Sequence, residues 1–224
     1  MDWPAIGLSA RLSACTALIL LVLGLPLAYW LATTRRRGRV FIEAIVALPL
    51  ILPPTVLGFY ILLSIGPKSS LGQGYEFLTG NLLPFSFQGL LLASTLYSLP
   101  FAVQPFVAAF RGLDKQLVEA AWSAGATPWR AFWGIVVPIC WPGLLSGVVL
   151  SFAHTVGEFG VVLMVGGNIE GVTRTVAISI YDDVQSLSYE RAALTSLVLL
   201  IFSFSVLSLT YTLQRNFRFS LWEK

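Results

Sequence analysis

Apolar windows separated by short polar segments recur along the whole chain. Each window holds about 18 or more mostly apolar residues, enough as a helix rising about 1.5 Å per residue to cross a hydrocarbon core of about 30 Å. The pattern predicts an all-α, polytopic membrane bundle that forms one domain over residues 1–224. We expect about five spans, at 8–32, 41–65, 87–110, 139–165 and 191–213.

The composition excludes an ordinary soluble domain. Hydrophobic residues make up 56% of the chain and charged residues 11%, whereas soluble domains are roughly 25% charged. The first window follows Met1-Asp2 and precedes a run of arginines, the reverse of the charge order in a secretory signal peptide, so we expect a retained span. Cys15 and Cys140 have neither disulfide-framework nor metal-ligand spacing, so we expect packing residues.

Lysine and arginine are distributed unequally between the loops, which predicts the orientation of the chain. Short cytoplasmic loops carry the excess of cations. We therefore place in the cytoplasm the segments that carry Arg35, Arg36, Arg37, Arg39, Arg111, Lys115, Arg130, Arg215, Arg218 and Lys224. The other side carries Arg11, Lys68, Arg174 and Arg191. The N-terminus is then outside, and the C-terminus is cytoplasmic.

Prolines lie near the centres of the second and third windows. A proline inside a helix removes a backbone donor and clashes with the preceding turn, and lipid cannot satisfy the freed carbonyls. Two helices interrupted at the same depth indicate a translocation pathway, although proline is also commoner in membrane helices than in soluble ones. The candidate pathway residues of these windows are Pro53, Pro54, Ser98, Pro100 and Gln104.

Polar residues recur along the fourth window. Gly147, Ser151, His154 and Glu158 are spaced to lie on one face of a helix. Ionisable groups in spans usually face the bundle interior or a wet cavity, so Ser151, His154 and Glu158 are further candidates for the pathway or its gate. Counted from Pro142, Glu158 lies roughly 24 Å along the helix, near the outer interface, which favours a structural or gating role. His154, the only histidine, is either a hydrogen-bonded packing residue or a ligand or proton relay.

The segment after the fourth window is expected on the outer side. Val176, Ile180 and Val184 are helically spaced and predict a short interfacial helix. Arg174, between two threonines, is a possible contact for a binding protein. A solvated loop charge is the alternative interpretation of this arginine.

The polar segment between the third and fourth windows carries helix signals that a simple connector does not need. Asp114 is placed to cap a first helix, and Gly125 is placed to end it. Thr127-Pro128 provides a cap and a first-turn proline for a second helix. We therefore expect a helix-turn-helix within the loop 111–138. A small face would let another surface approach closely, and it consists of Ala120, Ala121 and Ala124. An amphipathic connector lying at the interface is the alternative.

No pattern for nucleotide or metal chemistry occurs in the sequence. None of Lys68, Lys115 and Lys224 stands in a P-loop context, and no nucleophile-base, paired-carboxylate or metal-ligand constellation lies in the windows. We expect a chain that is not itself an enzyme and binds no metal or cofactor. The apolar cores also lack a lysine or arginine for selecting an anion from solution. This absence favours a conduit that receives its cargo from another protein, and an ATP-independent secondary transporter or channel is the alternative.

The loop 111–138 resembles the EAA-x3-G-x9-I-x-L-P signature of bacterial ABC-importer permeases. The match has the right spacing throughout and consists of Glu119-Ala120-Ala121, Gly125, Ile135 and Val137-Pro138. It departs from the signature at Val137, where the family usually has leucine. Three further stretches are similar to molybdate-importer permeases, and they are 48–60, 97–106 and 152–182. Sulfate and tungstate permeases share parts of the last stretch, so they remain alternatives.

The resemblance implies an inner-membrane permease that imports molybdate as part of a larger complex. That complex would hold two permease copies, two cytoplasmic ATPase subunits that bind ATP and Mg²⁺, and one periplasmic molybdate-binding protein, with lipid around the spans and no nucleic acid. The helix 114–124 would be the coupling helix that inserts into the ATPase and moves as a lever. The residues assigned to this contact are Glu119, Ala120, Ala121, Ala124, Gly125 and Pro128.

Overall fold

The computed structural model describes residues 1–222, with side chains described up to residue 212. The side chains of Arg215 and Arg218 and the whole of Lys224, which we expect in the cytoplasm, lie outside the described residues.

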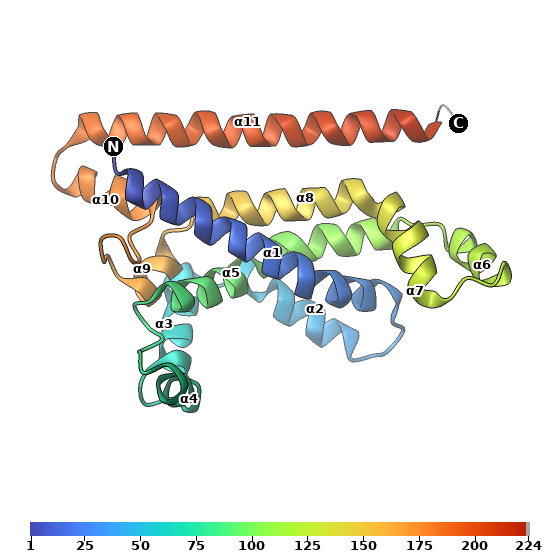
Figure 1. The fold of residues 1–224 in the computed structure, drawn as a ribbon, viewed down its shortest axis with the longest axis horizontal. Coiled ribbons are helices and arrows are strands. Elements are labelled where there is room, and N and C mark those ends of the chain that lie inside the picture. Colours follow the sequence, from blue (N-terminus) through green and yellow to red (C-terminus); the bar gives the residue numbers. More distant parts are fainter. Residues whose placement is uncertain (223–224) are drawn as a thin grey trace.

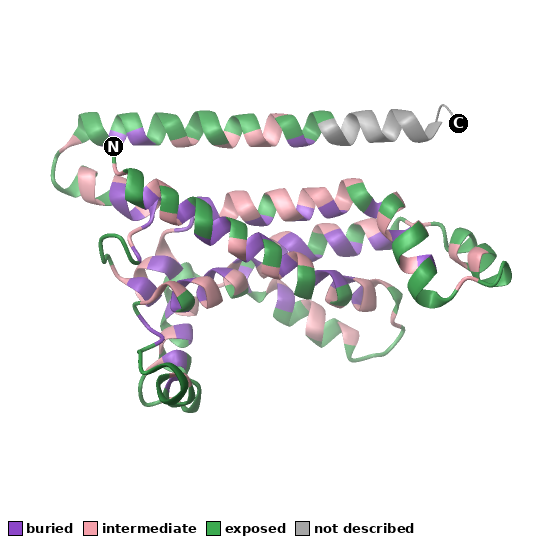
Figure 2. Ribbon diagram, viewed as in Figure 1, coloured by how far each residue is buried: buried purple, intermediate pink, exposed green. Residues whose placement is uncertain are grey.

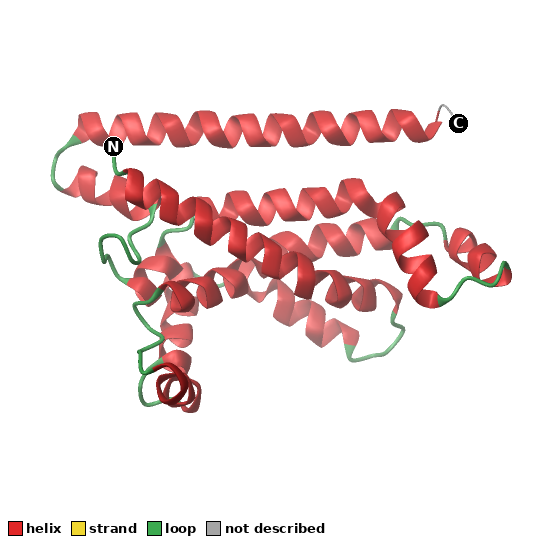
Figure 3. Ribbon diagram, viewed as in Figure 1, coloured by secondary structure: helices red, strands yellow, loops and turns green. Residues whose placement is uncertain are grey.

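The described chain is helical and contains no strand (Figure 3), so the predicted all-α class is confirmed. A short 3-10 turn, η1, follows α2, and a π-helical turn, η2, follows α7. In chain order the elements are α1 (Trp3–Thr33), α2 (Arg39–Ala47), η1 (Leu48–Leu50), α3 (Pro54–Ile65), α4 (Ser70–Thr79), α5 (Phe87–Arg111), α6 (Lys115–Ser123), α7 (Pro128–Ala131), η2 (Phe132–Val136), α8 (Val137–Val156), α9 (Gly160–Gly166), α10 (Val176–Gln185) and α11 (Tyr189–Trp222).

Membrane-spanning helices dominate the bundle. Within the described residues, four helical segments are long and apolar enough to cross a membrane, and they are Trp3–Thr33, Phe87–Arg111, Pro128–Val156 and Tyr189–Thr212. A bent pair, Arg39–Leu50 and Pro54–Ile65, raises the number to five if it counts as one span. The predicted polytopic bundle of about five spans is therefore confirmed.

The helices α1, α5 and α8 pack against one another and form the centre of the bundle (Figure 1). Phe106 of α5 is fully buried there, and the buried residues concentrate where these helices meet (Figure 2). Gly147 of α8 lies directly against Phe106, because an added Cβ would come within 2.5 Å of the ring carbon Cε1. The same Cβ would lie 2.7 Å from the carbonyl oxygen of Ala102. Glycine at this position therefore sets how closely α8 approaches α5.

The second predicted span is broken in the structure. Pro49 lies in η1, Pro53 is the cap residue of α3, and Pro54 is its first residue. The chain bends by 111° between the two halves, which follows because a proline at the first helical position starts a helix more easily than it continues one. The second half, α3, packs against α9.

The third predicted span is not interrupted, contrary to our expectation. Pro100 and Pro105 both lie inside α5, which runs as one helix from Phe87 to Arg111. The helix is packed on α1 and α8, and such neighbours can hold a helix together where single prolines remove hydrogen bonds. The idea of two helices broken at the same depth is therefore wrong.

The fourth span differs from the expected range 139–165. The helical segment begins at Pro128, passes through the π-helical turn and ends at Val156, and Gly157, Glu158 and Phe159 separate it from α9. The expected face of Gly147, Ser151, His154 and Glu158 is consequently wrong for Glu158, which lies beyond the end of α8. A run of apolar letters could not reveal this end, because Gly160 and the valines of α9 continue the apolar pattern.

The loop 111–138 and the N-terminus lie at opposite ends of the bundle (Figure 1). The short helix α10 lies near the N-terminus and contacts α1. Its Val176 is buried, and Val176 N donates to Ser9 Oγ of α1 at 2.8 Å. The cation distribution predicts that the N-terminus lies outside and the loop 111–138 lies in the cytoplasm, and their positions at opposite ends of the bundle agree with that orientation.

Candidate functional site

The helix-turn-helix predicted for the loop 111–138 is present and is capped as the sequence indicates. Asp114 Oδ1 accepts a hydrogen bond from Gln116 N at 2.9 Å at the start of α6. Gly125 follows the end of α6 with φ of +85°, a left-handed conformation that favours glycine. Thr127 Oγ1 accepts from Arg130 N at 3.3 Å, and Pro128 is the first residue of α7. Local capping therefore fixes both helices of the loop.

The loop projects from the end of the bundle (Figure 1), and its first helix has no buried residue. Glu119, Ala120 and Ala124 are exposed and Ala121 is half-buried. The Glu119 carboxylate forms no ion pair with a described residue. Three large aromatic side chains are exposed over the same loop, Trp122 at 49%, Trp129 at 70% and Trp133 at 47%. Exposed apolar side chains rimmed by charge are typical of a surface that binds another protein.

A cleft lies between this first helix and the end of α1. It has a volume of about 310 Å³, and Glu119 and Trp122 line it from α6. Arg35, Arg111 and Lys115 also line the cleft, so its charged side chains are three cations and one acid, and most of the remaining lining is apolar. The cleft and the small alanine side chains at the end of α6 leave room for another protein surface to come close.

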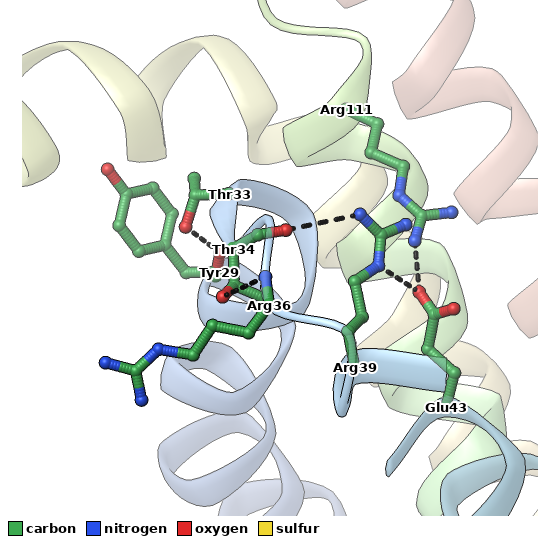
Figure 4. A network of polar contacts seen from close by, with 7 residues as sticks. All are labelled: Tyr29, Thr33, Thr34, Arg36, Arg39, Glu43 and Arg111. Carbon is green, nitrogen blue, oxygen red and sulfur yellow. Dashed lines mark hydrogen bonds and ion pairs between the residues drawn. The ribbon is translucent and has the colours of Figure 1, made fainter. Parts of the chain in front are cut away.

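A charged network at the start of the loop was not predicted from the sequence. Glu43 of α2 pairs with Arg39 one turn earlier, with Arg39 Nε 2.9 Å from Glu43 Oε1, and also pairs with Arg111 at the end of α5 (Figure 4). Arg39 Nη1 donates to the Thr34 carbonyl at 3.5 Å, just past the end of α1. The spacing of Arg39 and Glu43 is a recognisable helical signal, but Arg111 lies 68 positions from Glu43.

A second polar group joins α5 and α8 inside the bundle. Ser98 Oγ lies 2.9 Å from His154 Nδ1 and 2.9 Å from Thr155 Oγ1. The His154 ring is stacked on Phe101 with centroids 3.9 Å apart. Ser151 is fully buried, and its carbonyl accepts from Thr155 Oγ1 at 2.9 Å. Ser98, Ser151 and His154 are therefore brought together, and the packing role that we weighed for His154 agrees with its contacts.

Glu158 is buried without a matching charge. It is 4% exposed, and neither carboxylate oxygen forms a hydrogen bond of standard geometry within the described chain. The buried Ser94 hydroxyl lies close to the carboxyl but does not complete such a bond. Ser94 and the aromatic side chains around His154 were not among the site residues expected from the sequence.

The remaining pathway candidates differ in their burial and surroundings. Gln104 is exposed and lines a different cavity, of about 300 Å³, together with Glu43 and Arg111. Pro53 and Pro54 are exposed at the break between η1 and α3, and Pro100 is buried in α5. The structure therefore divides the candidates among separate regions.

Arg174, the possible contact for a binding protein, is held in ion pairs within the chain. Its guanidinium forms ion pairs with Asp2 at 3.4 Å and with Asp182 at 3.1 Å. Asn168 Nδ2 donates to the same Asp182 carboxylate at 2.6 Å. These contacts join the N-terminus to α10, so the side chain has a structural partner on each side. Asp182 lies eight residues after Arg174, but Asp2 lies 172 positions before it, and this second ion pair could not be predicted.

No group of three or more His, Cys, Asp or Glu side chains in the described part of the chain is arranged to hold a metal ion.

Comparisons with known proteins agree with this architecture. Residues 21–219 match the family model described as the binding-protein-dependent transport system inner membrane component. The molybdenum transport system permease protein ModB of Azotobacter vinelandii is 49% identical over 214 residues, which cover 96% of this chain and 95% of that protein. A probable sulfate transport system permease protein, cysT of Zygnema circumcarinatum, is 33% identical over 195 residues, covering 87% of this chain and 67% of that protein.

A solved structure has a similar fold. A bacterial ABC transporter involved in the import of the acidic polysaccharide alginate contains a chain that superimposes with a TM-score of 0.74 at 17% identity, covering 95% of this chain and 78% of that chain. The family expected from the loop signature is thus confirmed. The chain belongs to the family of inner-membrane components of binding-protein-dependent transport systems.

Proposed function

We propose that the chain is the membrane-spanning permease of an ATP-driven importer that translocates molybdate. The observation that carries this proposal is the 49% identity, over 96% of the chain, to a molybdenum transport permease. The stretch 152–182, which suggested molybdate from the sequence, contributes the end of α8, α9 and most of α10. It forms the outer end of the bundle, where a substrate delivered from outside would first meet the permease.

The loop 111–138 is the proposed docking site for a cytoplasmic ATPase. Its helices are capped, its first helix has no buried residue, and the exposed Trp122 and Trp129 provide apolar contact area. Glu119 supplies a charge that no described residue neutralises. Two such ATPase subunits, which bind ATP and Mg²⁺, would serve two copies of this permease. A periplasmic molybdate-binding protein would deliver the anion.

The pathway itself is proposed to run beside the polar group of Ser98, Ser151 and His154 and the broken second span. The break at Pro53 and Pro54 leaves backbone groups that must face protein or water rather than lipid. The ATPase must contact the loop differently in the inward-open and outward-open conformations, because a partner that binds two conformations equally does not change their populations.

The test is reconstitution of the permease in liposomes with its cognate ATPase and binding protein. We expect molybdate uptake that requires ATP, the ATPase and the binding protein together. Uptake by the permease alone would instead support a secondary transporter and would overturn the proposal.

Sulfate is the second candidate substrate, because a probable sulfate permease is 33% identical to the chain. Competition separates the two anions in the same liposomes, with tungstate included as a further competitor. Labelled molybdate uptake that excess sulfate leaves unchanged supports molybdate. Sulfate uptake that molybdate does not reduce would reassign the substrate while leaving the ATP-driven mechanism intact.

A further inference from the structure

The ion pair between Glu43 and Arg111 joins two segments that must move if the transporter changes its opening. Arg111 is the last residue of α5 and is followed by Gly112, Leu113 and the cap residue Asp114 of α6. Glu43 lies in the middle of α2, the first half of the broken second span. The pair therefore connects the start of the loop 111–138 directly to that half span (Figure 4).

The packing beneath the ion pair is incomplete. A cavity of about 300 Å³ separates parts of α2 and α5, and both Glu43 and Arg111 line it. Val46 is the buried residue of α2, near its C-terminal end, while Val40 and Phe41 are 68% and 74% exposed. Val46 and the partly buried Ile42 pack α2 against the bundle core, and the charged network adds a polar contact between Glu43 and the end of α5.

The ion pairs of Glu43 with Arg39 and Arg111 are weak enough to form and break during a transport cycle. Arg111 and Glu43 side chains are 44% and 34% exposed, and ion pairs at that exposure contribute little to stability and are screened by salt. Arg39 reinforces the carboxylate from the same helix and reaches the Thr34 carbonyl. A reversible tie of this kind can transmit a displacement without locking the bundle in one state.

We propose that Glu43 is a positioning residue that transmits displacement of the loop 111–138 to the broken second span. Arg111 moves with the start of the loop when the ATPase moves α6, and Glu43 carries the beginning of α2 with it. The break between η1 and α3 converts that movement into a change in the 111° angle of the span. The inference rests on the proposed function, because the ATPase supplies the displacement.

The first test measures coupling in the reconstituted complex. Glu43→Gln and Arg111→Gln should each raise the ATP hydrolysed per molybdate imported by up to about fivefold, the change that one exposed ion pair allows. The double variant Glu43→Arg with Arg111→Glu should return the ratio toward wild type. Arg37→Gln, an exposed cation in the same cytoplasmic segment, is the matched control and should leave the ratio unchanged.

The double variant separates coupling from folding. The inference would be overturned if the single variants leave the ATP hydrolysed per molybdate imported unchanged. It would also be overturned if the single variants raise this ratio and a stably folded double variant does not lower it again. The midpoint of thermal unfolding is measured for every variant. A misfolded variant would show a lowered midpoint, and both its ATP hydrolysis and its molybdate import would be low.

A second test needs no cargo, so it distinguishes failure of this inference from failure of the substrate assignment. Spin labels are placed at Val22 of α1 and Ile45 of α2, which are 69% and 65% exposed, after Cys15 and Cys140 are replaced by alanine. ATP, Mg²⁺ and vanadate should shift the distance between the labels in the complex with native Glu43. The Glu43→Gln complex should show a smaller shift. An equal shift in both complexes, or none in either, would overturn the inference.

Discussion

The hydroxyl of Ser98 on α5 lies 2.9 Å from Nδ1 of His154 on α8, so one small side chain connects two central helices of the bundle. The same hydroxyl lies 2.9 Å from Thr155 Oγ1. Removing a buried hydroxyl that contacts two polar groups should lower the free energy of unfolding by more than the loss of one contact, because both groups are left without a partner.

Ser98→Ala should therefore destabilise the protein by about 1 to 3 kcal/mol, the cost of leaving buried polar groups without a partner. Thermal unfolding of the purified protein measures the loss. Ser64→Ala is the matched control, because the Ser64 hydroxyl donates only to the Tyr60 carbonyl at an exposed position of α3. Equal unfolding midpoints for the two variants would contradict the assigned role of Ser98.

Gly147→Ala should destabilise the bundle through overpacking. The added Cβ would lie 2.5 Å from Phe106 Cε1 and 2.7 Å from a backbone oxygen, and neither the buried ring nor the backbone has room to move. Overpacking of a close-packed core typically costs about 1 to 3 kcal/mol. Gly7→Ala in α1, where no atom lies within 4 Å of the new Cβ, should unfold at or above the wild-type temperature, because alanine suits a helix interior better than glycine. A wild-type midpoint for Gly147→Ala would refute the close approach.

Gly125→Ala should impair transport more than it impairs folding. The residue has φ of +85°, and a Cβ there meets no atom within 4 Å, so the penalty is backbone strain confined to the turn. A non-glycine residue in that conformation costs roughly 1 to 2 kcal/mol, which would displace α6 relative to α7. Molybdate uptake and retention of the ATPase during purification should both fall, and Gly125→Trp should have the larger effect. Gly74→Ala, in α4 without a positive φ, serves as the control.

Glu119→Lys should weaken binding of the ATPase while leaving the permease folded. The side chain is exposed and forms no ion pair with a described residue, so its loss disturbs no internal contact. Co-purification of the ATPase, measured at low and at high salt, reports the change. Glu76→Lys on the exposed surface of α4 makes the same charge change at a helix far from the loop in Figure 1. Unchanged ATPase retention in Glu119→Lys would remove this residue from the interface.

Sequence alone predicted the features that depend on neighbours a few residues apart. Asp114, Gly125 and Thr127 act through hydrogen bonds and backbone conformation within one turn, and the apolar windows reflect the membrane rather than particular contacts. The loop signature has the same local character. These signals located the spans, the helix-turn-helix and the family.

Features that depend on distant parts of the chain could not be predicted. The continuity of α5 through Pro100 rests on packing against α1 and α8. The neutralisation of Arg174 requires Asp2 from the other end of the sequence. The partner of Glu43 lies on another helix, and the apolar pattern through α9 concealed the end of α8.

The π-helical turn Phe132–Val136 lies between α7 and α8 inside one uninterrupted helical segment. A π-helical turn accommodates one residue more than the α-helical path around it. Deleting a single residue there should turn it into a regular α-helical turn and leave the direction of the segment before it nearly unchanged. A deletion within the regular helix α8 should instead rotate everything before it by about 100° about the helix axis. The π-helical turn is therefore the one place in this segment where a residue can be lost without reorienting the exposed face of α6.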